Sequence, residues 1–92
     1  MPRLDDEQIR SFTEDNPQWM WSDDEITHTY ELADFNEAIG FVTRVALAAE
    51  KANHHPDIDI RWNEVTLTLS THSEGGLTEK DLEMAKVADE LA

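Results

Sequence analysis

Three histidines stand where segments of the chain end. His54 and His55 come just before Pro56, and His72 follows a run of alternating apolar and polar residues. Imidazole titrates near neutral pH, so a histidine can both give and take a proton during a reaction. Glu50, one helical turn before His54, would place a carboxylate beside them. The spacing indicates a proton-transfer site, and the plainer alternative is a set of polar residues at the end of a helix.

A metal site is the second chemistry that three imidazoles could support, because imidazole is a common metal ligand. His54 and His55 are adjacent at a helix end and would point in different directions, and no two histidines are spaced i, i+4. We therefore expect neither a metal nor a cofactor. The chain has no cysteine, which excludes disulfides and thiolate sites. His28, in an early strand, is expected to pack in the core or at an edge.

Asp81 has two interpretations. It is the third residue after Thr78, so its carboxylate can complete a capping box at the start of a helix. It could also reach the histidines, because Gly75-Gly76 breaks the preceding strand and turns the chain back toward His72. The capping role is the simpler of the two from sequence alone.

Two other features carry little specific chemistry. The tryptophans could stack on a flat heterocycle, but in so small a core large aromatic side chains more often serve packing (Trp19, Trp21, Trp62). The pair Gly75-Gly76 lacks the lysine and the strand–loop–helix context of a phosphate-binding loop, and no nucleophile elbow is present. Neither nucleotide binding nor a serine nucleophile is expected.

The elements that must position these residues can be read from periodicity and stop signals. We expect a helix over 5–14, strands over 19–21 and 26–32, a helix from Phe35 to about Ala52, strands over 57–62 and 65–70, and a last helix after Thr78. This order, αββαββα, predicts an α+β fold in which three helices pack on one face of a four-stranded antiparallel sheet. Residues 1–92 are expected to form one domain.

The second hairpin would bring the histidines together. If its turn lies at Asn63-Glu64, the antiparallel register places His55 opposite His72 at the open end of the sheet. Asn-Glu is not a strong two-residue turn sequence, so a slip of one or two residues remains open. Either register would leave the two histidines as neighbours.

The charge limits the partners. The 92 residues include 7 Lys+Arg and 21 Asp+Glu, for a net charge of −14, which argues against nucleic acid or an anionic membrane as a ligand. No signal peptide and no membrane-spanning run is recognisable, so a cytoplasmic location is expected. The even acidic coat suits a salt-rich cytoplasm, and an ordinary acidic protein is the alternative.

Several segments together resemble the pterin-4a-carbinolamine dehydratases. They are Phe35-Asn36-Glu37-Ala38, His54-His55-Pro56, Thr71-His72, Gly76-Leu77-Thr78 and Asp81, in order and without gaps. The resemblance covers about residues 35–91, and the first third of the chain fits more loosely. The combination is specific, whereas either the HHP or the THxxxGLT segment alone would be weak.

The resemblance implies an activity and a set of site residues. Members remove water from 4a-hydroxytetrahydropterin to give quinonoid dihydropterin, which recycles a tetrahydrobiopterin-type cofactor, and they use no metal. Their catalytic residues fall on His54, His55, His72 and Asp81. Their substrate contacts fall on Asn53 to His55 and on the segment Ser70, Thr71, His72 and Ser73. Members are homodimers or homotetramers, so a homo-oligomer is expected.

The resemblance also leaves alternatives open. Glu50, Pro56 and Trp62 are expected to support the site, and Trp62 would replace an aromatic residue that members commonly carry where Ile58 stands. Some relatives stabilise the dimer of a transcription factor through their helical surface, so an interaction module is a second possible function. In a host without an aromatic amino acid hydroxylase, the pterin could belong to another pathway, such as one related to molybdopterin.

Overall fold

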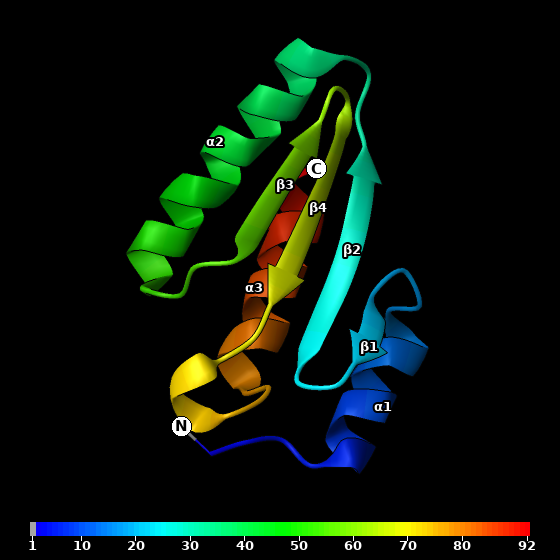
Figure 1. Cartoon of the computed structure of the whole chain (residues 1–92), viewed down its shortest axis with the longest axis vertical. Coiled ribbons are helices and arrows are strands. Elements are labelled where there is room, and N and C mark those ends of the chain that lie inside the picture. The colour runs from blue at the N-terminus through cyan, green and yellow to red at the C-terminus, as the bar shows by residue number, and fades with distance from the viewer. Residues whose placement is uncertain (1) are drawn as a thin grey trace.

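Residues 2–92 are described by a computed structural model, and its elements follow the expected order (Figure 1). Within these residues there are three α-helices, four strands and one 3₁₀ turn: α1 (Asp6–Asp15), β1 (Met20–Ser22), β2 (Glu25–Glu31), α2 (Phe35–Ala52), β3 (Asp57–Arg61), β4 (Glu64–Leu69), η1 (His72–Glu74) and α3 (Glu79–Leu91). The predicted α+β class is confirmed. None of the helices in residues 2–92 has the length and apolarity needed to cross a bilayer.

The sheet has the strand order β1-β2-β4-β3, and every neighbouring pair is antiparallel. Alternation along the strands sends one set of side chains to the core and the opposite set outward. Most of the inward set on β2 and β4 is fully or almost fully buried: Ile26, Tyr30, Val65, Leu67 and Leu69. The outward set consists largely of threonines, two pairs of which face each other across β2 and β4. The sheet therefore has one dry face and one polar face.

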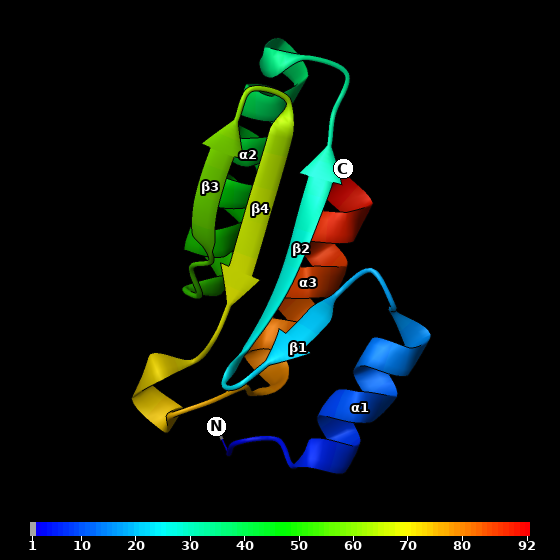
Figure 2. The same cartoon turned by 45° about the vertical axis from the view of Figure 1, so that its right-hand side comes forward.

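Helices α2 and α3 lie next to one another on the dry face of the sheet, whereas α1 lies beside β1 at its edge (Figures 1 and 2). Ile9 and Phe12 of α1 join the same buried cluster as the residues of α2, α3 and the sheet. The predicted packing role of tryptophan is confirmed for Trp19, which is 1% exposed. One continuous core thus supports all three helices.

Helix α2 forms and ends for local reasons that decide where the histidines go. Asp34 Oδ1 accepts a hydrogen bond from the Glu37 backbone N–H at 2.8 Å and caps the first turn. At the other end Asn53 is left-handed (φ 52°, ψ 44°), its N–H donates to Glu50 O, and the His54 N–H donates to Ala49 O. This is a Schellman motif, in which asparagine tolerates the left-handed conformation. The chain leaves the helix there, so His54 begins a new direction.

The predicted turn of the second hairpin was wrong by one residue and its register by two. Arg61 pairs with Glu64, so the two-residue loop is Trp62-Asn63 rather than Asn63-Glu64. Trp62 takes the left-handed conformation (φ 52°) that the loop requires, which is uncommon for a bulky residue. The last pair at the other end is Asp57 with Thr68, so the histidines lie beyond the paired strands.

Candidate functional site

Asp81 is the centre of the site. It lies in the first turn of α3 and is 0% exposed. Its Oδ2 accepts hydrogen bonds from the Thr78 backbone N–H at 2.9 Å and from Thr71 Oγ1 at 2.7 Å, and its Oδ1 meets His54 Nε2 at 2.5 Å. Asp81 therefore serves the start of the helix and also reaches a histidine. The two roles considered from the sequence, helix capping and contact with a histidine, are thus both fulfilled by Asp81.

The protons in this network can be assigned from its donors and acceptors. The Thr71 hydroxyl gives its one proton to Asp81, so the Thr78 hydroxyl must donate to Thr71 Oγ1, 2.9 Å away. An ionised Asp81 only accepts, so Nε2 of His54 carries a proton and its Nδ1 remains as the second polar atom of the ring. Within residues 2–92 no buried side-chain polar atom lacks a partner. The network holds the His54 ring, which is 10% exposed, in one orientation.

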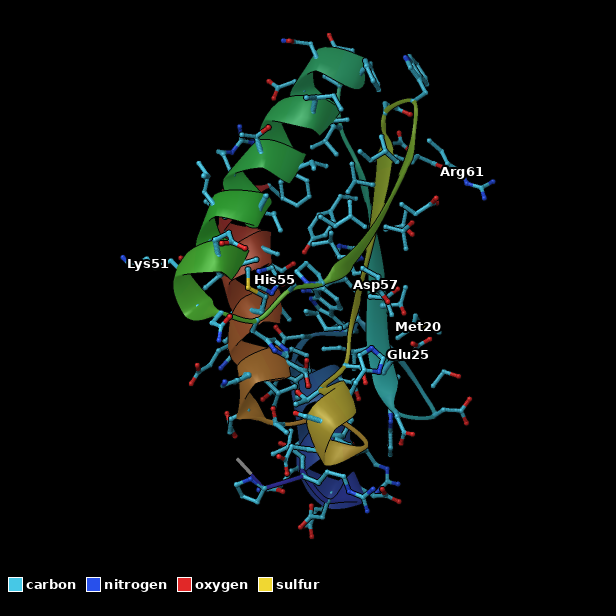
Figure 3. All side chains as sticks on the ribbon, turned by 60° about the vertical axis from the view of Figure 1, so that its left-hand side comes forward. Met20, Glu25, Lys51, His55, Asp57 and Arg61 are labelled. Atoms are coloured by element: carbon cyan, nitrogen blue, oxygen red, sulfur yellow. The ribbon has the colours of Figure 1, made fainter. Side chains whose placement is uncertain are left out.

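His55 has a different environment from His54. Its side chain is 54% exposed, and its Nε2 lies 2.6 Å from Oε1 of Glu50, which is itself 77% exposed. Figure 3 shows His55 at the C-terminal end of α2, before Asp57 at the start of β3, whereas Lys51 projects outward from the other side of the helix. The carboxylate that the sequence placed beside the histidines is thus a partner of His55, because the turn at Asn53 sends His54 toward α3 instead.

His72 lies in η1, directly after the buried Thr71. Thr71 forms an isolated bridge with Gly76, and the Gly75 N–H donates to His72 O from a left-handed conformation (φ 71°). These bonds close a short loop that leaves the His72 side chain exposed. Thr71 ties this loop to Asp81, so the same carboxylate that binds His54 also fixes the residue before His72.

The N-terminal segment packs against the His72 loop. Arg3 Nη1 donates to Gly75 O at 3.2 Å, and the Leu4 N–H donates to Leu77 O at 2.8 Å. A Cβ atom on Gly76 would lie 3.0 Å from Cδ of Arg3, so a larger residue there would require the Arg3 side chain to shift slightly. Residues far apart in the sequence therefore hold the loop from its outer side.

His54 and His72 line two separate hollows of the chain. His54 lines a groove of about 590 Å³ between α2 and α3, whose lining is Ala48, Lys51, Ala52, His54, Lys80, Glu83, Met84 and Val87. His72 lines another hollow of about 330 Å³, together with Ser70 and acidic residues of the β1–β2 turn. The Ser70 hydroxyl already donates to Asp24 O at 2.8 Å. His55 lines neither of these two hollows.

The remaining predicted site residues adjoin the histidines in the chain, with the exception of Trp62. Asn53 and Pro56 flank the histidine pair, and Ser73 follows His72 in η1. Trp62 lies at the far end of β3 from the histidines, where it is 67% exposed, so a single chain does not bring it to them. In residues 2–92 no three His, Asp or Glu side chains are grouped so that they could hold a metal ion.

A second carboxylate on α3 was missed in the sequence. Asp89 accepts hydrogen bonds from Tyr30 Oη at 2.6 Å, Trp19 Nε1 at 3.1 Å and Gln18 Nε2 at 2.9 Å. Burial and the hydrogen bond to Asp89 raise the pKa of the Tyr30 hydroxyl well above its usual range. His28 packs between Trp19 and Tyr30, with ring centroids 5.4 and 4.1 Å away, and burial lowers its pKa although Asp89 opposes the shift. The packing role expected for His28 is confirmed.

Comparison with known families identifies the chain. A family model described as pterin 4 alpha carbinolamine dehydratase matches residues 2–91. The chain belongs to this family. The resemblance read from the HHP and THxxxGLT segments is confirmed, and the match includes the first third of the chain, which had fitted more loosely.

Individual members of the pterin-4a-carbinolamine dehydratase family match over nearly their whole lengths. A relative from Nocardia farcinica is 57% identical over 89 residues, which cover 97% of this chain and 94% of the relative. A relative from Chloroflexus aurantiacus is 52% identical over 91 residues, which cover 99% and 98%. Both are named as pterin-4-alpha-carbinolamine dehydratases.

Solved structures show the same fold. A Brucella melitensis protein described as a transcriptional coactivator/pterin dehydratase superposes with a TM-score of 0.93 at 37% identity, over 98% of both chains. A pterin dehydratase-like protein described as a RuBisCO assembly factor in the alpha-carboxysome superposes with a TM-score of 0.68 at 20% identity, over 80% of this chain and 86% of the other. The second likeness shows the fold alone.

Proposed function

We propose that this protein dehydrates 4a-hydroxytetrahydropterin to quinonoid dihydropterin, with His54, His55 and His72 as proton-transfer groups and Asp81 as the carboxylate that orients His54. In the cell this reaction would recycle a tetrahydrobiopterin-type cofactor. The observation that carries the proposal is the Asp81 network, which joins the histidine pair after α2 to the His72 loop after β4. The type of reaction is inferred from membership of the pterin-4a-carbinolamine dehydratase family.

The reaction needs two proton transfers. The bond between C4a and its hydroxyl oxygen breaks, and a proton delivered to that oxygen lets it leave as water. The proton on N5 goes to a base, and the electron pair left on N5 forms the C4a=N5 double bond. Groups that titrate near neutral pH suit both transfers, each of which typically contributes about 10²–10⁴-fold.

His54 is suited to accept a proton. Its Nε2 is bound to Asp81, which leaves Nδ1 as the ring atom that can take the proton. The buried carboxylate would then stabilise the imidazolium that forms, since an opposite charge at hydrogen-bond distance favours the charged ring. The Thr71 hydroxyl is already bound to Asp81, which supports a positioning role for Thr71 rather than a direct contact with substrate.

His55 is suited to be the essential acid or base. It is more than half exposed, so a substrate can approach it, and the contact of its Nε2 with Glu50 at 2.6 Å can orient the ring. His72 is exposed in η1, the turn that follows β4, and would share the second proton transfer. Asn53, Pro56, Ser70 and Ser73 frame these side chains, and we propose that backbone and side-chain groups of these segments contact the pterin.

The proposal is tested by supplying the carbinolamine and following the absorbance of the quinonoid product. His55→Ala should lower kcat by about 10²-fold or more with the fold retained. His28→Gln, a change to a half-buried histidine that packs against Trp19 and Tyr30, is the matched control and should retain turnover. Wild-type activity should show a bell-shaped dependence on pH around neutrality. A flat profile from about pH 5 to about pH 9, or near-normal turnover by His55→Ala, would refute imidazole catalysis.

An interaction function is the second candidate, because one solved relative is described as a transcriptional coactivator as well as a dehydratase. Helix α2 carries large apolar side chains that are partly or largely exposed: Phe35, Ile39 and Leu47. Such a surface supports the proposal of a homodimer or homotetramer, or of a protein partner. Sedimentation of the wild type and of Leu47→Gln tests it: a smaller assembly in the variant supports the interface, and a monomeric wild type would contradict it.

A further inference from the structure

Two residues on either side of β3 have surroundings that a single chain leaves incomplete. His55 is 54% exposed and lines neither of the two hollows near the histidines, so these hollows do not enclose a ring bound against it. Trp62 is 67% exposed and takes a left-handed conformation (φ 52°) that bulky side chains rarely adopt. His55 precedes the strand and Trp62 follows it. A second chain lying along β3 could join them.

Strand β3 is an open edge of the sheet. The strand order β1-β2-β4-β3 leaves one side of β3 without a neighbouring strand among residues 2–92. In Figure 3 this edge faces the viewer, and no other helix or strand crosses in front of it. All five residues of β3 are exposed, including Ile58 and Ile60, which lie opposite core residues of β4 and share their face of the sheet. An uncovered edge with apolar side chains is a template for pairing with another chain.

The hairpin decides which backbone groups of β3 face the open edge. A two-residue loop closes on a hydrogen-bonded pair, here Arg61 with Glu64, and such pairs alternate with non-bonded pairs along an antiparallel ladder. The N–H and C=O groups of Ile58 and Ile60 therefore point away from β4. A second copy of β3 can bond to them only in registers that keep this alternation.

Charge selects one of the two-fold symmetric antiparallel registers. Copies centred on Ile58 would set Asp57 against the partner's Asp59. Copies centred on Asp59 would pair Asp57 with the partner's Arg61 but would set Asp59 against itself. Copies centred on Ile60 place Asp59 opposite the partner's Arg61 twice and bring no like charges together. Opposite charges directly across a ladder are favourable and like charges are not, so the register centred on Ile60 is preferred.

We infer that two copies of this chain pair antiparallel through β3, centred on Ile60, and that the partner's Trp62 thereby lies beside Ile58 and completes the site around His55. Ile58 follows His55 by three residues, or about 10 Å of extended chain, and an indole is large enough to contact a ring bound between them. The inference rests on the proposed function, because the partner's ring becomes a wall on which a pterin at His55 can stack. Trp62 then supports the site of the other chain and not its own.

Charge-reversed strands test the pairing without turnover. At about 50 mM salt, where screening is weak, sedimentation should show a smaller assembly for Asp59→Arg and for Arg61→Asp than for the wild type. An equimolar mixture of the two variants should regain the wild-type size, because each chain then meets its complement. Glu31→Arg, the same kind of change at the end of β2, is the control and should keep that size. A monomeric wild type, single variants of normal size, or a mixture that stays small would each overturn the inference.

Mixed dimers test whether Trp62 acts across the interface. Trp62→Asn removes the ring and suits the left-handed turn, so it should fold and lower kcat/KM by about tenfold. A dimer of one Trp62→Asn chain and one His55→Ala chain contains one site with both His55 and the partner's Trp62. An equal mixture, refolded together, should therefore reach about a quarter of the wild-type kcat/KM per chain, against about a twentieth if Trp62 acts within its own chain. Native mass spectrometry verifies that mixed dimers have formed.

A role for Trp62 across the interface would be overturned by a mixture of verified mixed dimers that reaches only the lower value. Wild-type kcat/KM in Trp62→Asn would overturn it as well. The pairing and the proposed dehydration fail in distinguishable ways. Normal sedimentation results in a protein that turns over no carbinolamine would contradict the dehydration and leave the pairing in place. Turnover by a monomeric wild type would contradict the pairing and leave the dehydration in place.

Discussion

Helix α3 carries two carboxylates that each accept three hydrogen bonds, yet only one of them serves a reactive side chain. Asp81, in the first turn, binds His54, whose ring lines the α2–α3 groove. Asp89, near the end of the helix, binds Tyr30 and Trp19, whose rings are buried in the core. The same kind of hydrogen-bond acceptor therefore occurs once at the candidate site and once beside the hydrophobic core.

The difference lies in the partner and not in the carboxylate. The phenol of Tyr30 and the indole of Trp19 each have one polar atom, and Asp89 occupies it. The imidazole of His54 has two, so it can be held by Asp81 and still offer a nitrogen to a ligand. The raised pKa of Tyr30 keeps its proton in place at ordinary pH, which suits a structural group. A carboxylate–histidine pair thus combines fixed geometry with a free reactive atom.

Removal of Asp81 should have the largest effect. Asp81→Ala leaves three buried donors without an acceptor, and we expect a loss of about 3–5 kcal/mol in the free energy of unfolding, measured by urea denaturation. Asp81→Asn keeps the volume and one acceptor, so it should fold better while still losing most turnover. An Ala variant within about 1 kcal/mol of wild type would show that the network contributes little to stability.

Asp89→Ala should destabilise the fold by about 2–3 kcal/mol, because Asp89 is only partly buried and its lost partners are neutral donors. Turnover per folded molecule should stay within about twofold of wild type. A loss of turnover beyond tenfold in protein shown to be folded by circular dichroism would mean that the two carboxylates are not separate in function.

Thr71→Val and Tyr30→Phe form a matched pair of variants, since each change removes a single hydroxyl donor from one of the two carboxylates. Both should lower the free energy of unfolding by about 1–2 kcal/mol. Only Thr71→Val should lower kcat and displace the pH profile of kcat/KM, because Asp81 then holds His54 less firmly. Identical pH profiles for the two variants would contradict a positioning role for Thr71.

The smallest expected effect concerns His28. Burial lowers its pKa below the usual value of 6.5, so below that pH the unfolded chain binds a proton that the folded chain does not. The free energy of unfolding should therefore fall as the pH is lowered through about 6.5, by at most about 1.4 kcal/mol per pH unit for one proton. His28→Gln should show a shallower fall than wild type between about pH 7 and about pH 5.5, and parallel curves would contradict the shift.

The elements were predictable where several local signals agree. The bounds Phe35–Ala52 of α2 match the expected ones, because a cap at Asp34, an apolar stripe and the stop before Pro56 all indicate the same helix. The hairpin register was not predictable, because Trp62 takes a left-handed conformation that glycine or asparagine would normally signal. Packing of the whole sheet decides that turn.

The contact between Asp81 and a histidine was predictable, and the pairing of each carboxylate with a particular histidine was less so. His54 contacts Asp81 and His55 contacts Glu50 because of the direction that the chain takes after Asn53. An asparagine at this position is a sequence signal for a left-handed helix end, and that signal could have been used to predict the change of direction. Composition alone does not distinguish Asp89 from the many other acidic residues of the chain. Its position four residues after the buried Ala85 was the signal that it shares the inner face of α3.

The contact between Arg3 and the Gly75-Gly76 turn has a practical consequence for anyone who produces this protein. A fusion tag or a processing scar joined just ahead of Arg3 would start within a few residues of the segment that braces His72. Altered binding or kinetics in such a preparation would report on the added peptide and not on the protein itself. A removable tag after Ala92, or none at all, leaves that brace intact.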